Sequence, residues 1–297
     1  MPESAEDKAR KVVIVTASYA GDFDRCKLLC ETVDAHVSGF SEHLILVAGH
    51  DVDLFRTIET PNRRVIDERE LLPGWLHVVR DPTSLFSRHL WLSFRTKPLR
   101  GWHVQQLRRM AIAAHCDAEA MFYCDSDVVF LRDFDCADLW LADGLRFLKR
   151  PGALANPSLI KHRRWVANAD RALGIDADSA AMDDYIATAI AWRRDTLTRL
   201  CRHIEDVHGR HWVEVVASTR EFSECMLYGR FVDAVLGGEG HSPTTDELCH
   251  IYWDGPQLSD SDLAGFVAQM GPEQVAIGLQ SFVGTDLDSV RRLIKAA

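Results

Sequence analysis

The sequence lacks the motifs that would directly assign a common nucleotide-dependent or hydrolytic reaction. It contains no G-x-G-x-x-G, G-x-x-x-x-G-K-S/T, H-E-x-x-H or G-x-S-x-G pattern. These patterns position dinucleotides, phosphate groups, zinc ions and nucleophilic serines, respectively. Their absence argues against a dehydrogenase, a P-loop NTPase, a zincin and an α/β-hydrolase.

The chain also lacks excess positive charge, closely paired cysteines and long apolar runs. Its net charge of −10 argues against a nucleic-acid-binding surface. The eight cysteines include no C-x-x-C pair, which argues against structural zinc and favours free thiols in a reducing compartment. No apolar run is long enough to span a membrane, and residues 1–10 are short and charged. We therefore expect a flexible tail at 1–10 and a cytoplasmic protein, with Trp91 and Trp102 as candidates for peripheral membrane contact.

Strands and helices are predicted to alternate in the first half of the chain. A β-branched run at 11–18 predicts a buried strand, and apolar residues at helical spacing predict a helix at 22–37. A strand at 44–48 completes a βαβ unit, which implies parallel strands. A helix at 101–116 and a strand at 118–123 follow. The second half predicts helices at 161–173, 195–208 and 223–236 and short apolar strands at 186–192 and 249–253.

The strongest chemical signal is the triplet Asp125-Ser126-Asp127, which directly follows the apolar strand at 118–123. If the strand continues, Asp125 and Asp127 project from the same face. Ligands bind at the carboxyl ends of strands in open α/β sheets, and two neighbouring carboxylates repel unless a cation lies between them. A hard cation such as Mg²⁺ or Mn²⁺ fits this need.

The triplet has two other interpretations. Asp is common in turns, so the pair may simply end a strand; the apolar strand before it and VVFLRDFD after it favour a site. Phosphatase-like hydrolases carry a Thr after their paired Asp residues and place the motif after the first strand. Here the motif is D-S-D-V-V and comes late in the chain.

Six stretches resemble the GT-A glycosyltransferases, and more closely a bacterial family of GT-A-like proteins: VTASYAGDFDRCKLLCETV, GWHVQQLRRMA, FYCDSDVVFLRDFD, AWRRDTLTRLCRHIE, FSECMLYGRFVD and CHIYWDG. They spread over most of the chain. The resemblance implies an α/β, GT-A-like, Rossmann-related domain at 11–297 with a mostly parallel sheet flanked by helices. Residues 11–150 would form its nucleotide-binding half and 151–297 its acceptor-side half.

The resemblance also implies a metal site. Asp125 would reach the metal and the donor ribose, Asp127 would bind the metal, and His250 in CHIYWDG would complete the coordination of Mn²⁺ or Mg²⁺. His241 is the competing histidine. A lone histidine is more often a packed or surface residue than a ligand, so both interpretations of His250 stay open.

The donor, a nucleoside diphosphate sugar, would contact the loop after the first strand and the helix at 101–116. The loop could instead cap the helix that follows it, and it could also do this while it binds the donor. One of Arg108 and Arg109 is expected on a solvated face. The residues implied for donor binding are Thr16, Ser18, Tyr19, Asp22, Gln106 (with Gln105 as the alternative), Arg109, Asp125 and Ser126.

Two carboxylates are candidates for catalysis. Glu224 follows the helix cap Ser223, and an ionised carboxylate there could deprotonate an acceptor hydroxyl or only hydrogen-bond it. The alternative is a helix-start carboxylate without chemistry. Asp184, next to Asp183, is a second candidate for binding sugar hydroxyls.

The sequence thus predicts a metal-dependent glycosyltransferase that moves a sugar to a hydroxyl acceptor such as a cell-surface glycan. Two rival functions stay open: a sugar-nucleotide hydrolase or nucleotidyltransferase, and a non-catalytic protein that binds sugar nucleotides on the same fold. A hydrolase or nucleotidyltransferase would release free sugar or pyrophosphate instead of a glycoside. A non-catalytic binding protein would show no turnover with any donor. No nucleic-acid partner is expected.

Overall fold

Five strands form the central sheet of the computed structural model, which describes residues 10–142, 144–176 and 182–296. The predicted tail at 1–10 lies almost wholly outside these residues. The strands run in the order β13 (Ala189–Arg193), β8 (Ala120–Cys124), β1 (Val12–Ala17), β3 (Glu42–Val47) and β4 (Arg63–Asp67). All neighbours are parallel except β13, which runs antiparallel to β8. The predicted α/β class with a mostly parallel sheet flanked by helices is confirmed.

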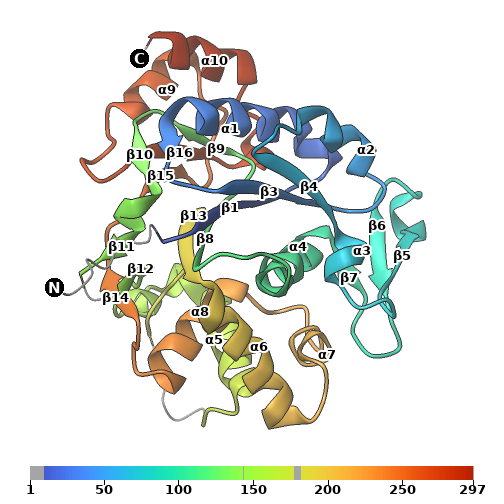
Figure 1. Cartoon of the computed structure of the whole chain (residues 1–297). Helices are drawn as coiled ribbons and strands as arrows, with labels where there is room; N and C mark the ends of the chain where they lie inside the picture. Colours follow the sequence, from blue (N-terminus) through green and yellow to red (C-terminus); the bar gives the residue numbers. More distant parts are fainter. Residues whose placement is uncertain (1–9, 143, 177–181, 297) are drawn as a thin grey trace, which may run out of the picture.

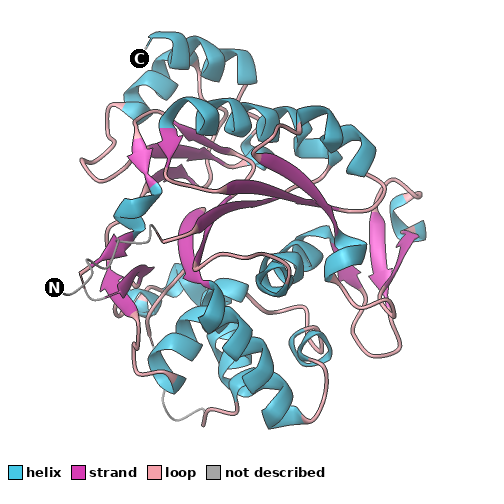
Figure 2. Cartoon of the chain, viewed as in Figure 1, coloured by secondary structure: helices cyan, strands magenta, loops and turns pink. Residues whose placement is uncertain are grey.

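Helices cover both faces of this sheet, as Figures 1 and 2 show. On one face, α1 (Phe23–His36) buries Cys26, Leu29 and Val33, which recur at helical spacing. On the other face α4 (Gly101–Ala111) packs beneath β1 and β8. The remaining helices are α2 (Val52–Phe55), α3 (Glu68–Leu71), α5 (Ile160–Leu173), α6 (Arg194–His208), α7 (Trp212–Val216), α8 (Glu224–Arg230, continued by a π-helical turn at Phe231–Val235), α9 (Asp260–Val267) and α10 (Leu287–Ala296).

Smaller sheets surround the central one. The sheet β15–β16–β9 consists of Cys249–Tyr252, Ala276–Leu279 and Val128–Phe130. The antiparallel sheet β5–β6–β7 consists of His77–Arg80, His89–Leu92 and Leu99–Arg100, and it lies at one edge of the molecule (Figure 1). The other short strands are β2 (Val37–Ser38) with β10 (Phe134–Asp135), and β11 (Trp140–Leu141) with β12 (Gly144–Leu148) and β14 (His241–Thr244).

Most predicted elements form close to their expected positions. The apolar run at 11–18 becomes β1 because all six residues of VVIVTA are buried between helices. The helices α5 and α6 end at Gly174 and Gly209, whose positive φ angles of 67° and 61° suit a helix C-terminus. In the described residues no helix has the length and apolar character that crossing a bilayer requires. Trp91 is buried and donates to Glu68, so the expectation of an exposed Trp91 is wrong, whereas Trp102 is half-exposed.

Candidate functional site

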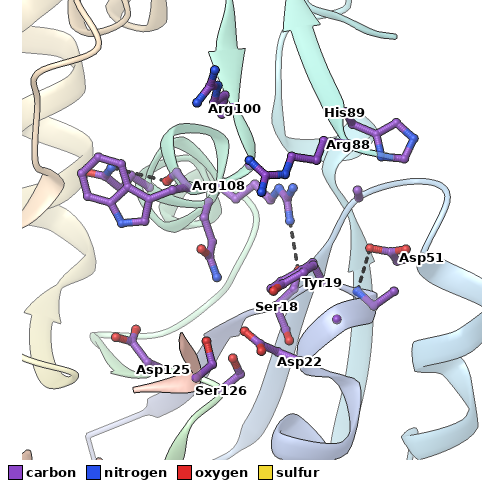
Figure 3. A pocket seen from close by; sticks show the side chains of 18 of the residues that line it. Ser18, Tyr19, Asp22, Asp51, Arg88, His89, Arg100, Arg108, Asp125 and Ser126 are labelled. Atoms are coloured by element: carbon purple, nitrogen blue, oxygen red, sulfur yellow. Dashed lines mark hydrogen bonds between the residues drawn. The ribbon is translucent and has the colours of Figure 1, made fainter. Parts of the chain in front are cut away.

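A cavity of about 840 Å³ opens at the carboxyl ends of β1, β3 and β8 (Figure 3). Ser18 follows β1, His50 follows β3 and Asp125 follows β8, and all three line it. The chain leaves β1 toward β3 on one side and returns to β8 on the other, so the cavity lies where the strand order reverses. This is where open α/β sheets bind ligands, and the volume suits a small-molecule site.

The Asp125-Ser126-Asp127 triplet forms a turn between two sheets. The strand β8 ends at Cys124, the Val128 amide donates to the Asp125 carbonyl (3.1 Å), and β9 begins in the sheet with β16. The expectation of a continuous strand with alternating side chains is therefore wrong. All three residues of the triplet nevertheless line the cavity, because the turn stands at its floor.

Arg109 joins two carboxylates of the cavity. Its Nη1 donates to Asp125 Oδ1 at 2.9 Å and lies 3.3 Å from Glu224 Oε1. The guanidinium is buried against the rings of Tyr123 and Trp192, which fixes its position. Burial raises the pKa of Asp125 to about 6; Arg109 opposes this rise and Glu224 adds to it. One cation thus contacts the buried carboxylate of Glu224 and the partly exposed carboxylate of Asp125, and the neutralisation is incomplete.

Asp127 has less compensation than Asp125. Its Oδ2 accepts from the Ser281 amide at 3.1 Å, whereas its Oδ1 is buried without a hydrogen-bond partner. Burial, followed by the negative charges of Asp125 and Asp22, raises the pKa of Asp127 to about 7. Burial also raises the pKa of Asp22. Crowded carboxylates of this kind attract a cation.

Side chains of helix α4 form hydrogen bonds with two other elements at the cavity, β1 and α8. Gln105 donates to the Ala17 carbonyl at the end of β1 (2.7 Å), and Gln106 accepts from the Glu224 amide (3.1 Å). Arg108 and Arg109 are both buried, so the expectation that one of them lies on a solvated face is wrong. Arg108 pairs with the buried Glu68 at 3.0 Å.

Two arginines that the sequence analysis missed line the cavity. Arg88 precedes β6 and Arg100 precedes α4, and neither forms an ion pair within the described parts of the chain. Figure 3 shows them across the cavity from Asp22 and Asp125. The cavity therefore has an acidic side and a basic side. Both arginines follow irregular, proline-broken sequence, which offers no periodic signal.

A family model described as a family of unknown function, DUF6492, matches residues 11–270. The chain belongs to the DUF6492 family. Comparison with curated proteins gives no match.

Two solved structures similar to this DUF6492 chain are of the galactosyltransferase LgtC. One is LgtC in complex with donor and acceptor sugar analogues: it is 11% identical, with a TM-score of 0.47, and the alignment covers 90% of this chain and 87% of that one. The other is an active-site mutant of LgtC, 12% identical with a TM-score of 0.45 over the same shares. At these scores the likeness assigns no function, which has to be argued from the residues themselves.

Several predicted residues of the DUF6492 chain meet in the cavity. Besides the Asp triplet, Arg109 and Glu224, the loop after β1 contributes Ser18, Tyr19 and Asp22, and α4 contributes Gln106. Thr16 does not line the cavity. It lies within β1, two residues before Ser18, and its buried hydroxyl lies 3.0 Å from His43 Nε2.

The two predicted residues His250 and Asp184 lie elsewhere. The His250 ring on β15 stacks on Phe266 of α9, with ring centroids 4.1 Å apart, and does not line the cavity. Asp184 is buried in an ion pair with Arg150 at 2.9 Å. The competitor His241 hydrogen-bonds Tyr228, also away from the cavity.

A second missed group lies directly after β16. Gln280, Ser281 and Phe282 line the cavity, and the Ser281 amide binds Asp127. A signal existed: residues 276–279 are an apolar run followed by polar residues, the same pattern that marked the Asp triplet.

Proposed function

We propose that this DUF6492 chain is a metal-dependent glycosyltransferase. It would transfer a sugar from a nucleoside diphosphate sugar to a hydroxyl acceptor. The observation that carries this proposal is the cavity itself. Four carboxylates line it, namely those of Asp22, Asp125, Asp127 and Glu224. Arg88 and Arg100 lie across from Asp22 and Asp125 (Figure 3), and within the described residues neither arginine forms an ion pair.

The acidic side fits a divalent cation. Asp127 Oδ1 is a buried oxygen without a partner, and its carboxylate is crowded by Asp125 and Asp22. No group of three or more His, Cys, Asp or Glu side chains among the described residues is arranged to hold a metal. Mg²⁺ is commonly bound by one or two carboxylates together with substrate phosphates, so Asp125 and Asp127 would suffice as protein ligands. A bound Mg²⁺ or Mn²⁺ would neutralise charge on the departing diphosphate.

The basic side fits the remaining charge of the donor. Arg88 and Arg100 form no ion pair within the described residues, and guanidinium binds phosphate through paired N–H donors. Tyr19 exposes about half of its surface at the cavity, where its ring can stack on a base. These residues would orient the donor while the carboxylates face its diphosphate.

Glu224 is the best-placed group for the acceptor. It is buried at the start of α8, its amide is bound by Gln106, and its carboxylate lies beside Arg109. An ionised carboxylate held at the cavity wall can accept the proton of an attacking hydroxyl. It would thereby raise the nucleophilicity of that hydroxyl as the bond to the leaving diphosphate breaks.

The donor site is tested by thermal unfolding with nucleoside diphosphates and their sugars, with and without Mn²⁺. A ligand at about one hundred times its Kd stabilises the folded state by about 2.7 kcal/mol, which gives a clear rise in Tm. We expect one nucleotide class to give a Mn²⁺-dependent shift that Asp127→Ala abolishes. The control Asp53→Ala, whose side chain is 97% exposed, should keep the shift.

Turnover of the donor identified in this way tests the reaction. We expect Asp127→Ala to lower kcat/KM by about a hundredfold or more, as loss of transition-state charge stabilisation does. Glycoside as the product supports transfer, whereas free sugar or pyrophosphate identifies a hydrolase or a nucleotidyltransferase. If no nucleotide raises Tm at saturating Mn²⁺, the donor site and the proposed function are wrong.

A further inference from the structure

The segment 77–100, which forms the sheet β5–β6–β7 and its loops, differs in charge from the rest of the protein. It holds five Lys or Arg residues and one Asp, a net charge of +4, in a chain whose net charge is −10. We call this segment the basic sheet. Positive charge gathered on one element of an acidic protein indicates a negatively charged partner.

The basic sheet also exposes large apolar side chains. Leu85 is 90% exposed and Phe94 is fully exposed, although such residues usually bury most of their surface. Isolated exposed hydrophobic residues are ordinary, but several on one short element mark an interaction site. The exposed large apolar residues of the basic sheet are Val78, Val79, Leu85, Phe86, Leu92 and Phe94.

The loop between β5 and β6 is built to present two of these residues. Among the described residues, Leu85 and Phe86 are the non-glycine residues with positive φ, 52° and 61°. Side chains of this size rarely adopt the left-handed region, because their Cβ then crowds the following carbonyl oxygen. Hydrogen bonds hold the loop in this form. The Asp81 carbonyl accepts from the Phe86 amide at 3.0 Å, and the Asp81 carboxylate accepts from the Thr83 amide. The Asp81 amide donates to the Arg88 carbonyl. The protein thus maintains a strained loop whose apolar side chains contact solvent.

From this combination we propose that the basic sheet docks the protein on an anionic lipid bilayer. Apolar side chains such as Leu85 and Phe86 enter the boundary between head groups and acyl chains, and the exposed Arg80 and Lys97 meet the lipid phosphates. A second copy of the chain is the alternative occupant, because β5 is an edge strand with four exposed residues. Two copies of this segment would repel each other, because each keeps an excess of positive charge even after Arg95 pairs with Glu214, and this favours the bilayer.

Docking would set the cavity mouth at the lipid head groups. Ser87, Arg88 and His89 of the basic sheet also line the cavity, so the two sites are continuous. If the proposed function holds, the hydroxyl acceptor would then be carried by a membrane component. The docking itself does not depend on turnover, so its test can succeed or fail independently of the proposed function.

Vesicle flotation of the full chain tests the docking. We expect binding to phosphatidylcholine vesicles that contain phosphatidylglycerol, much weaker binding to phosphatidylcholine alone, and weaker binding at high salt. The double variant Leu85→Ser with Phe86→Ser should lower the partition coefficient about tenfold or more. Phe94→Ser, on the other loop of the sheet, should lower it by a smaller factor.

The matched control is Ile160→Ser with Val207→Ser, two exposed apolar residues on α5 and α6. It should bind vesicles as the unaltered chain does, and thermal unfolding should show that all variants fold. Failure of the unaltered chain to bind anionic vesicles overturns the proposal, as does equal binding by the Leu85/Phe86 variant. A dimer in light scattering that this variant dissociates would assign the surface to a second copy and also overturn it.

Discussion

Asp184 and the cavity aspartates Asp125 and Asp127 differ in how their charge is neutralised. Asp184 is paired with Arg150, and backbone amides and His162 also face its carboxylate. Burial alone would raise its pKa, but these partners hold the pKa of Asp184 below its usual value. At the cavity, desolvation raises the pKa of Asp125 to about 6 and that of Asp127 to about 7.

The difference separates a structural carboxylate from one prepared for a ligand. Asp184 is fully supplied with partners inside the chain, so a ligand has nothing to add. Asp127 keeps one buried oxygen without a partner, and its neighbours Asp125 and Asp22 add repulsion. Because the negative charge at Asp127 is only partly neutralised, it lowers the stability of the free protein. A bound cation would neutralise this charge and restore the stability.

The largest stability effect is expected at Asp184. The variant Asp184→Asn removes a buried charge that pairs with Arg150 and His162 and leaves Arg150 only its pair with Glu247, which should lower the free energy of unfolding by about 2–4 kcal/mol. The exposed Asp53→Asn should change it by less than about 0.5 kcal/mol. Urea unfolding of both variants measures the difference. Equal stabilities would show that the Arg150 pair contributes nothing and that the two aspartate groups are alike.

At Asp127 we expect the opposite: removing the charge should raise the free energy of unfolding. Its folded-state pKa of about 7 lies above the ordinary value of 3.8, so stability falls as the pH rises from about 4, and the loss is complete above about pH 7. We expect Asp127→Asn to raise the free energy of unfolding of the metal-free protein by about 1–2 kcal/mol near pH 8. The gain should shrink as the pH falls toward 5, because the folded parent protein then binds a proton.

Thermal unfolding between pH 5 and 8, with chelator and then with Mn²⁺, checks this expectation. Mn²⁺ with nucleotide should stabilise the parent protein and leave Asp127→Asn unchanged, which reverses the order of the two melting temperatures. A variant less stable than its parent at pH 8 without metal would remove the distinction between the two aspartate groups.

Much of the fold follows from local sequence pattern. The runs VVIVTA and HLILV are apolar and β-branched because both faces of β1 and β3 are covered by helices. The spacing of Cys26, Leu29 and Val33 similarly defines α1. The basic sheet β5–β6–β7 was not predicted, because its exposed strands show no alternation between a buried and a solvated face.

The site was predictable where residues follow directly from a strand end, as Ser18 and Asp125 do. Partner choice was not predictable: Asp184 and Asp127 are both acidic residues in loops, and only the fold brings Arg150 to one and Ser281 to the other. The sequence also did not predict which way the side chains of β15 face. His250 lies on a strand that approaches the cavity, but its neighbour Cys249 faces inward beside Gly278.

The smallest effect is therefore expected at His250. Its ring stacks on Phe266 outside the cavity, so it has no path to a cation held by Asp125 and Asp127. We expect His250→Gln to change the Mn²⁺-dependent affinity for the nucleotide by less than about twofold, since it removes no ligand. Titration calorimetry beside Asp127→Asn gives the comparison. A loss comparable to that of Asp127→Asn would mean that β15 and α9 rearrange when metal binds, and would make His250 a ligand.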